Sequence, residues 1–279
     1  DALVKSSQID NAISEYRRAV NLQPESNLFN TSYKQCYELL QKINYGSHDG
    51  KKVNEIDVTY ENDLRTFFET NTGRVIHKWV HYFEIYELYF NRFRKTDVHF
   101  LEIGVSHGGS LQMWKKYFGP KATIYGVDID SRCKQLEDDQ IKIFIGDQAN
   151  IEFWTQFKKE VPKLDIVLDD GGHKMLQQIN SFEALFGHIS KNGIYMVEDL
   201  CTSYWNQYGG GYKHNNTFIE YSKNLIDYLN AWYSQDESSL KISDFTRDTW
   251  SINYYSNVMV IEKREIKEPY HKKTGGIKL

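Results

Sequence analysis

The sequence predicts an α/β protein with a mostly parallel, doubly wound sheet, an antiparallel strand at its C-terminal end, and helices in front of the sheet. Three observations support this prediction. Apolar segments ending in glycine or acidic residues recur from residue 98 onward, amphipathic helical segments separate them, and two further strand-like segments, 251–255 and 258–262, lie close together in the chain. Strands that are apolar on both faces and alternate with helices are typical of a parallel sheet covered on both sides.

Length and composition favour a packed, reduced protein. The chain has 279 residues, 40% of them hydrophobic and 15% aromatic, which suffices for one large domain and a smaller appendage. A net charge of −4 gives no reason to expect nucleic acid or an anionic membrane as partner. Cys36, Cys133 and Cys201 are widely spaced, which favours a reduced, cytoplasmic protein. No apolar run approaches the roughly 20 residues of a membrane-inserted helix.

The N-terminal part of the sequence predicts helices. Ile9, Ile13, Tyr16 and Val20 recur at helical spacing, and residues 11–24 resemble the closing helix of a tetratricopeptide repeat, although a plain helical hairpin fits equally well. We expect a helical segment over 1–45, a linker and helical lead-in over 46–97, the main α/β domain over 98–265 and a tail over 266–279. Because Asp1 falls within helical sequence, we expect the chain to be a piece of a longer protein.

Strands and helices alternate through the main domain. Before it, aromatic residues at helical spacing over 64–68 and 79–93 predict helices that cover the mouth of the sheet. Amphipathic helices are expected at 151–161 and 175–188. The five apolar strands are expected at 98–105, 123–128, 141–147, 164–169 and 193–198.

A glycine-rich turn follows the first strand and opens a helix. Its glycines let the backbone approach a ligand closely, but an acidic residue stands two positions before the first glycine, unlike the turn of dinucleotide binders. A pyrophosphate would be repelled by that carboxylate, whereas the sulfonium and amino group of S-adenosylmethionine would be attracted. The candidate cofactor-binding residues of this turn are Glu102, Gly104, Ser106, Gly108 and Ser110.

The next two strands also end in candidate cofactor residues. Asp128 directly ends the second strand, where a carboxylate is placed to accept both ribose hydroxyls. Asp147 and Gln148 end the third strand and are suited to the adenine edge. Each feature alone fits ordinary loop chemistry. Three of them in order, at the carboxyl ends of successive strands, favour a bound S-adenosylmethionine.

Acidic residues end the fourth and fifth strands. In a doubly wound sheet these ends are neighbours, so Asp170, Glu198 and Asp199 should converge. Clustered carboxylates repel unless a cation offsets them, and all-oxygen ligation suits Mg²⁺. These three residues are therefore the predicted metal ligands. Asp169 should point back into the sheet, because neighbours on a strand face opposite ways.

His173 follows Asp170 across two glycines and is the predicted catalytic base. An imidazole near its ordinary pKa is matched to removing a hydroxyl proton around neutral pH, and a metal-bound hydroxyl would be easier to deprotonate. A histidine after two glycines can also serve loop packing. Its place beside the carboxylates favours catalysis.

Three segments resemble class I, Mg²⁺-dependent sugar O-methyltransferases of the macrocin and mycinamicin type. They are residues 100–114 (FLEIGVSHGGSLQMW), 168–173 (LDDGGH) and 197–205 (VEDLCTSYW), within a similarity that covers residues 72–262. The resemblance implies a Rossmann-like methyltransferase fold, S-adenosylmethionine and Mg²⁺ as cofactors, and a sugar or glycan acceptor. It assigns the metal to Asp170, Glu198 and Asp199, the base to His173 and the ribose contact to Asp128.

The same resemblance implies that His77 touches the donor, in the segment 73–79 that leads into the pocket. Many relatives have histidine at the position of Cys201. The glycine- and aromatic-rich segment 204–213 fits a substrate lid or a plain flexible loop. A cephalosporin hydroxylase-like enzyme and a non-catalytic module of a glycan-assembly (polysaccharide biosynthesis) protein are the alternative functions. A homo-oligomer, or further domains in a longer chain, is also expected.

Overall fold

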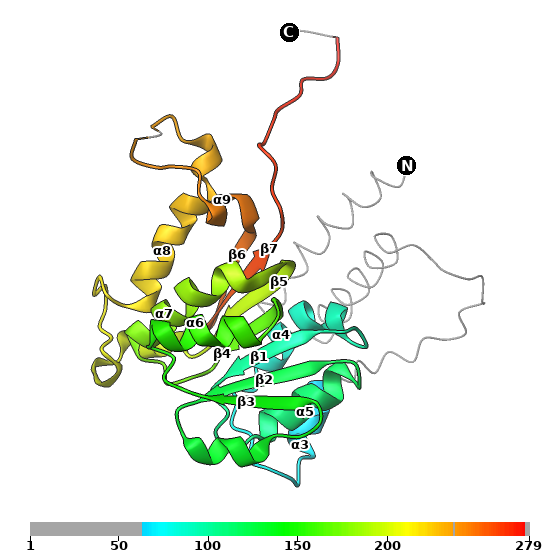
Figure 1. Ribbon diagram of the computed structural model, residues 1–279. Coiled ribbons are helices and arrows are strands. Elements are labelled where there is room, and N and C mark those ends of the chain that lie inside the picture. Colours follow the sequence, from blue (N-terminus) through cyan, green and yellow to red (C-terminus); the bar gives the residue numbers. More distant parts are fainter. Residues whose placement is uncertain (1–62, 237, 277–279) are drawn as a thin grey trace, which may run out of the picture. The chain divides into compact units, whose positions relative to one another are not determined.

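The computed structural model describes residues 63–236 and 238–276, and its centre is a seven-stranded sheet (Figure 1). The strand order is β3-β2-β1-β4-β5-β7-β6. β1 to β5 are parallel, and β7 and β6 add an antiparallel hairpin beside β5. The strands are β1 (His99–Ile103), β2 (Thr123–Asp128), β3 (Ile141–Ile145), β4 (Leu164–Asp169), β5 (Ile189–Val197), β6 (Thr249–Tyr255) and β7 (Val258–Lys263). The predicted fold class is confirmed.

The order of the strands reverses between β1 and β4. The chain runs outward from β1 through β2 to β3 and then returns to pair β4 with the other side of β1. Loops that leave the carboxyl ends of β1 and β4 therefore turn to opposite faces, which opens a crevice between them. This crevice is where an open α/β sheet binds its ligands.

Helices cover both faces of the sheet (Figure 1). One face packs against α3 (Asp63–Glu69), α4 (Tyr82–Phe90) and α5 (Gly109–Phe118), and the other against α6 (Ile151–Glu160), α7 (Met175–Leu185) and α8 (Phe218–Leu229). The short α9 (Asp244–Asp248) leads into β6. The 3₁₀ helices are η1 (Asn91–Phe93), η2 (Ser131–Leu136), η3 (Phe186–His188), η4 (Leu200–Tyr204), η5 (Asn206–Tyr208) and η6 (Ala231–Tyr233).

Aromatic side chains fill the layer between α4, α5 and the sheet. Phe90, Phe100, Trp114 and Phe118 are fully buried, with ring centroids 5.1–6.3 Å apart. Rings at these distances add to the free energy of burial through edge and offset contacts. This layer fixes α4 and α5 on the sheet and so fixes the loops that begin or end at their termini.

Two sequence predictions differ from the structure, and one helix was missed. The helices before the sheet do not cover its mouth: α3 and α4 pack on one face, and residues 75–78 of the irregular segment between them border the crevice instead. β5 starts at Ile189 rather than residue 193, and its register with β4 shifts between Ile189 and Ile194. α8 was not predicted. The predicted N-terminal helices over 1–45 lie outside the described residues.

Within residues 63–236 and 238–276, the helices are all too short or too polar to cross a membrane.

Candidate active site

A pocket of about 380 Å³ opens at the carboxyl ends of β1 to β4. The turn after β1, the ends of β2 and β3, and the loop after β4 form its walls, and the segment 75–78 closes one side. This is the crevice where the strand order reverses. Most of the predicted cofactor residues line it, namely His77, Gly104, Ser106, Ser110, Asp128, Asp147 and Gln148.

The turn after β1 is held by Asp128 at the end of β2. Asp128 Oδ2 accepts hydrogen bonds of 2.9 Å from the backbone N–H groups of Val105 and Ser106, and its Oδ1 accepts one from Asp130. Gly104 has a φ of 97°, and a Cβ at this position would lie 2.1 Å from the carbonyl oxygen of Asp170. Glycine is therefore required where the loops after β1 and β4 pass each other.

Two predicted cofactor residues, Glu102 and Gly108, do not line the pocket. Glu102 is fully buried on β1, where its Oε2 accepts a 2.6 Å hydrogen bond from Ser110. Burial raises the pKa of Glu102, and Lys78 opposes that rise. Glu102 therefore contributes to the wall of the pocket and does not present its carboxylate to the cavity.

Gln148 borders the pocket, but its side chain is engaged in the protein. Its Nε2 donates to Asp169 Oδ1 at 3.1 Å, and its Oε1 accepts from the backbone of Gly172 at 2.7 Å. Asp147 is exposed at the same strand end. Of the two residues predicted to meet the adenine edge, only Asp147 keeps its side chain open toward solvent.

Asp169 and Asp170 point to opposite sides of the sheet, as expected for strand neighbours. Asp169 is fully buried and accepts hydrogen bonds from Gln148 and, at 3.4 Å, from Tyr195. Burial raises its pKa to about 7. Asp170 lines the pocket.

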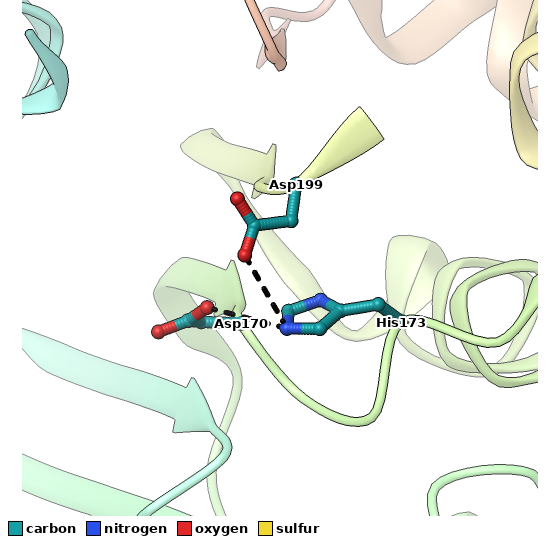
Figure 2. A group of neighbouring side chains, drawn as sticks. All are labelled: Asp170, His173 and Asp199. Atoms are coloured by element: carbon teal, nitrogen blue, oxygen red, sulfur yellow. Dashed lines mark ion pairs between the residues drawn. The ribbon is translucent and has the colours of Figure 1, made fainter. Parts of the chain in front are cut away.

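Figure 2 shows Asp170, His173 and Asp199 facing one another at the rim of the pocket. His173 Nε2 lies 3.5 Å from Asp199 Oδ2 and 3.8 Å from Asp170 Oδ1. One potential ligand atom from each of the three residues lies within 4.8 Å of the others. His173 and Asp199 also have positive φ values, 55° and 54°. Such strained backbone in residues other than glycine clusters at functional sites.

Asp199 is oriented by three hydrogen bonds to one of its oxygens. Oδ1 accepts from Trp79 Nε1 at 3.0 Å, from the Tyr82 hydroxyl at 2.8 Å and from Asn257 Nδ2 at 3.0 Å. Its other oxygen, Oδ2, faces His173. Because Oδ1 is held from three sides, Oδ2 is fixed at the rim of the pocket.

Lys78 is a site residue that the sequence did not reveal. Its side chain is 2% exposed, and its Nζ lies 2.5 Å from Asp170 Oδ2, 3.1 Å from Glu198 Oε2 and 3.2 Å from Glu102 Oε1. Burial disfavours the ammonium, but these carboxylates outweigh it and hold the pKa of Lys78 well above its usual range. Lysine in a loop has no local signature, and only its position in segment 73–79, beside His77, hinted at the pocket.

Glu198, one of the three predicted metal ligands, does not belong to the group of Asp170, His173 and Asp199. Its side chain is 1% exposed, and its two oxygens contact the Tyr86 hydroxyl and Lys78. Burial and the charge of Asp170 raise its pKa well above the usual range, against the opposing effect of Lys78. The structure therefore brings Asp170, Asp199 and His173 together and pairs Glu198 with a lysine.

The exposed part of this acidic group fits a hard divalent cation. Asp170 and Asp199 are 19% and 24% exposed and offer carboxylate oxygens, the donors that Mg²⁺ prefers. Lys78 brings one positive charge to a region that also holds Asp170, Glu198, Asp199 and Glu102. A cation beside Asp170 and Asp199 would offset the remaining negative charge.

Several curated sugar methyltransferases are similar to this chain. It is 34% identical over 199 residues to demethylmacrocin O-methyltransferase of Streptomyces fradiae, covering 67% of this chain and 50% of the relative. It is 33% identical over 188 residues to mycinamicin VI 2''-O-methyltransferase of Micromonospora griseorubida, covering 64% and 47%. The chain thus spans about half the length of the curated relatives it matches. No protein-family model matches it.

A solved structure agrees with the fold and with these sequences. The MycE methyltransferase from the mycinamycin biosynthetic pathway, in complex with Mg, SAH and mycinamycin VI, matches with a TM-score of 0.64 and 30% identity, over 73% of this chain and 53% of that one. The sheet, its antiparallel end and the crevice between β1 and β4 define a Rossmann-like methyltransferase domain. The chain belongs to the family of sugar O-methyltransferases of the macrocin and mycinamicin type.

Proposed function

We propose that this chain transfers a methyl group from S-adenosylmethionine to a sugar hydroxyl of a glycoside, assisted by Mg²⁺. The observation that carries the proposal is the position of Asp170, His173 and Asp199 at the rim of the pocket between β1 and β4. By their names the relatives are O-methyltransferases, and a further one, 8-demethyl-8-alpha-L-rhamnosyl tetracenomycin-C 2'-O-methyltransferase of Streptomyces olivaceus, acts on a rhamnosyl glycoside. Sugar methylation within glycan assembly, a cytoplasmic location and a homo-oligomer stay predictions.

The pocket would hold the donor through the turn after β1 and the ends of β2 and β3. Asp128 is the proposed ribose-binding residue, and Asp147 the proposed contact to the adenine. S-adenosylmethionine supplies an electrophilic methyl group and retains the electrons of the broken C–S bond on sulfur. Glu102 forms an ion pair with Lys78 behind the pocket. We therefore do not propose Glu102 as a direct contact to the donor.

Asp170 and Asp199 would hold Mg²⁺, which when bound lowers the pKa of an acceptor hydroxyl. Asp199 is suited to this because its Oδ1 is anchored and its Oδ2 is presented at the rim. Asp170 presents Oδ1 toward His173 while Lys78 holds its Oδ2. Glu198 remains a predicted ligand, but it is the weakest of the three because its side chain is 1% exposed and both of its oxygens are engaged, by Tyr86 and by Lys78.

His173 is the proposed general base. Its Nε2 faces both carboxylates, so it can accept the proton of an acceptor hydroxyl, and the resulting imidazolium would be stabilised by Asp170 and Asp199. The ring is only 18% exposed. That partial burial limits competition from bulk water for the same proton.

Removing divalent cations is expected to abolish methyl transfer. The purified chain, methyl-labelled S-adenosylmethionine and a panel of glycosides would be assayed for labelled product before and after treatment with EDTA. The rate should fall to background with EDTA and return with excess Mg²⁺, because Asp170 and Asp199 then regain the cation that activates the hydroxyl. A rate that EDTA leaves unchanged would contradict the metal assignment.

The same assay separates the alternatives. A cephalosporin hydroxylase-like enzyme would give no methylated product with any acceptor. A non-catalytic glycan-assembly module would, in addition, show no Mg²⁺-dependent chemistry on the acceptor. Either result would count against the proposed function.

A further inference from the structure

Two consecutive residues, Lys78 and Trp79, each hold one oxygen of a carboxylate at the rim of the pocket. Lys78 Nζ lies 2.5 Å from Asp170 Oδ2, and Trp79 Nε1 donates a 3.0 Å hydrogen bond to Asp199 Oδ1. Figure 2 shows the other oxygen of each carboxylate turned toward His173 Nε2, at 3.8 Å for Asp170 and 3.5 Å for Asp199. One short segment therefore helps to orient both of the oxygens that face the rim.

The same segment borders the pocket proposed for the donor. Residues 75–78 line that pocket together with the turn after β1. The backbone at the start of the segment lies on the first residue of α5, where a Cβ on Gly109 would come within 2.4 Å of the carbonyl oxygens of Arg74 and Val75. Ser110, the next residue of α5, lines the pocket as well. A donor bound there would contact the segment that holds the two carboxylates.

Residues 75–79 form neither helix nor strand, and their side chains alternate between solvent and the protein. Val75, His77 and Trp79 are exposed, whereas Ile76 packs against the apolar core and Lys78 contacts the buried carboxylates. Irregular segments with few buried contacts are among the least stable parts of a fold. Contacts from a ligand should therefore add to the order of this segment.

We propose that Trp79 is a positioning residue of the cation site, and that the segment 75–79 makes the donor and the divalent cation bind cooperatively. This inference rests on the proposed function. A donor that packs against residues 75–78 fixes the Lys78 ammonium and the Trp79 indole N–H, and with them the oxygens of Asp170 and Asp199. A cation then binds without a further cost of ordering the segment. Coupling between two sites is reciprocal, so the cation must raise the affinity for the donor by the same factor.

The test is the affinity of the full chain for Mn²⁺ with and without saturating SAH, measured by electron paramagnetic resonance of the free ion. SAH has no methyl group to transfer, so no turnover disturbs the titration. We expect SAH to lower the Kd for Mn²⁺ about tenfold, and Mn²⁺ to lower the Kd for SAH by the same factor.

Trp79→Phe and Tyr82→Phe form a matched pair of variants. Each removes one hydrogen bond to Asp199 Oδ1, at 3.0 Å from Trp79 and 2.8 Å from Tyr82, but Tyr82 belongs to α4 and is not among the residues that line the donor pocket. Both should weaken Mn²⁺ binding about three- to tenfold in the absence of SAH, because each loses one hydrogen bond to the same oxygen.

The two variants should differ in their response to SAH. In Tyr82→Phe the effect of SAH on the Kd for Mn²⁺ should stay about tenfold. In Trp79→Phe it should fall below about threefold, since only Lys78 then links the segment to the rim. A purely structural role of Trp79 would make the variants behave alike. The affinity for SAH without metal should be the same in both variants and in the wild type, which shows that the donor pocket is intact.

Three results would overturn the inference. They are an effect of SAH that is equal in the wild type and in Trp79→Phe, an equal loss of that effect in both variants, and independent binding of SAH and Mn²⁺ to the wild type. Each of them leaves the proposed function standing, because the donor and the cation still bind. A wild-type chain that binds no Mn²⁺, with or without SAH, would contradict the metal assignment of the proposed function and this inference with it.

Discussion

The substitution Lys78→Met is expected to lower the free energy of unfolding by about 3–5 kcal/mol, because it leaves buried carboxylates without their counter-charge. Lys78 is 2% exposed and lies within 3.2 Å of Glu102, Asp170 and Glu198. Methionine fills nearly the same volume but supplies no charge. The measurement is urea unfolding followed by tryptophan fluorescence, since the buried Trp114 and Trp154 report on the loss of the core.

Lys115→Met is the matched control for this experiment. Lys115 also contacts two carboxylates, Asp138 at 2.9 Å and Asp139 at 2.8 Å, but its side chain is 26% exposed and that of Asp139 is 85% exposed. Ion pairs in contact with solvent contribute at most about 1 kcal/mol, so this variant should be nearly as stable as the wild type. Similar stability losses for the two variants would contradict the special role of Lys78.

Added Mg²⁺ should restore part of the stability lost in Lys78→Met. A cation that binds the folded chain and not the unfolded chain raises the free energy of unfolding. In this variant it would also replace a missing positive charge beside Asp170. No stabilisation by Mg²⁺ in either the variant or the wild type would argue against a cation at this rim.

The substitution His173→Ala is expected to lower kcat by about 10²–10⁴-fold while leaving the affinity for SAH near that of the wild type. The loss follows from the position of Nε2, which faces Asp170 and Asp199 at the rim and not the turn after β1 that would hold the donor. Single-turnover methyl transfer and SAH titration measure the two quantities separately. A wild-type rate in this variant would show that another group takes the proton.

A titration with Mn²⁺ distinguishes a base from a ligand. His173 belongs to the same compact group as Asp170 and Asp199, so its ring could in principle complete a metal site. If His173 is a base, His173→Ala should bind Mn²⁺ with unchanged affinity. If His173 is a metal ligand, the variant should bind Mn²⁺ more weakly. His271→Ala, which changes an exposed histidine in the C-terminal tail, is the control for both measurements.

The candidate site residues that could be predicted from the sequence are those whose positions follow from the order of the strands. Asp128, Asp170 and Asp199 each follow a strand whose apolar pattern is visible in the sequence, and parallel strands bring their carboxyl ends to one edge. Alternation along β4 also separated Asp169 from Asp170 correctly, since Asp169 is buried and Asp170 lines the pocket. These predictions needed only the local pattern and the order of elements.

The parts that sequence analysis missed depend on contacts between distant segments. Lys78 precedes Asp170 by 92 residues and Glu198 by 120, and nothing near it in the sequence indicates that it is buried. The engagement of Gln148 with Asp169 and Gly172 likewise follows from packing across the sheet. A cavity beside Trp79 and Asn257 is lined by four separate segments, residues 79–81, 200–205, 219–226 and 254–257, so no motif within one of them describes it.

We propose that the carboxyl edge of the parallel strands holds both a methyl donor and a divalent cation. A crystal structure of the chain soaked with SAH and Mn²⁺ tests it most directly, because Mn²⁺ gives an anomalous signal. We predict SAH in the pocket beside Gly104, Asp128 and Asp147, and a single anomalous peak in contact with carboxylate oxygens of Asp170 and Asp199. SAH bound elsewhere, or an anomalous peak away from both carboxylates, would show that the donor and cation sites are wrongly assigned.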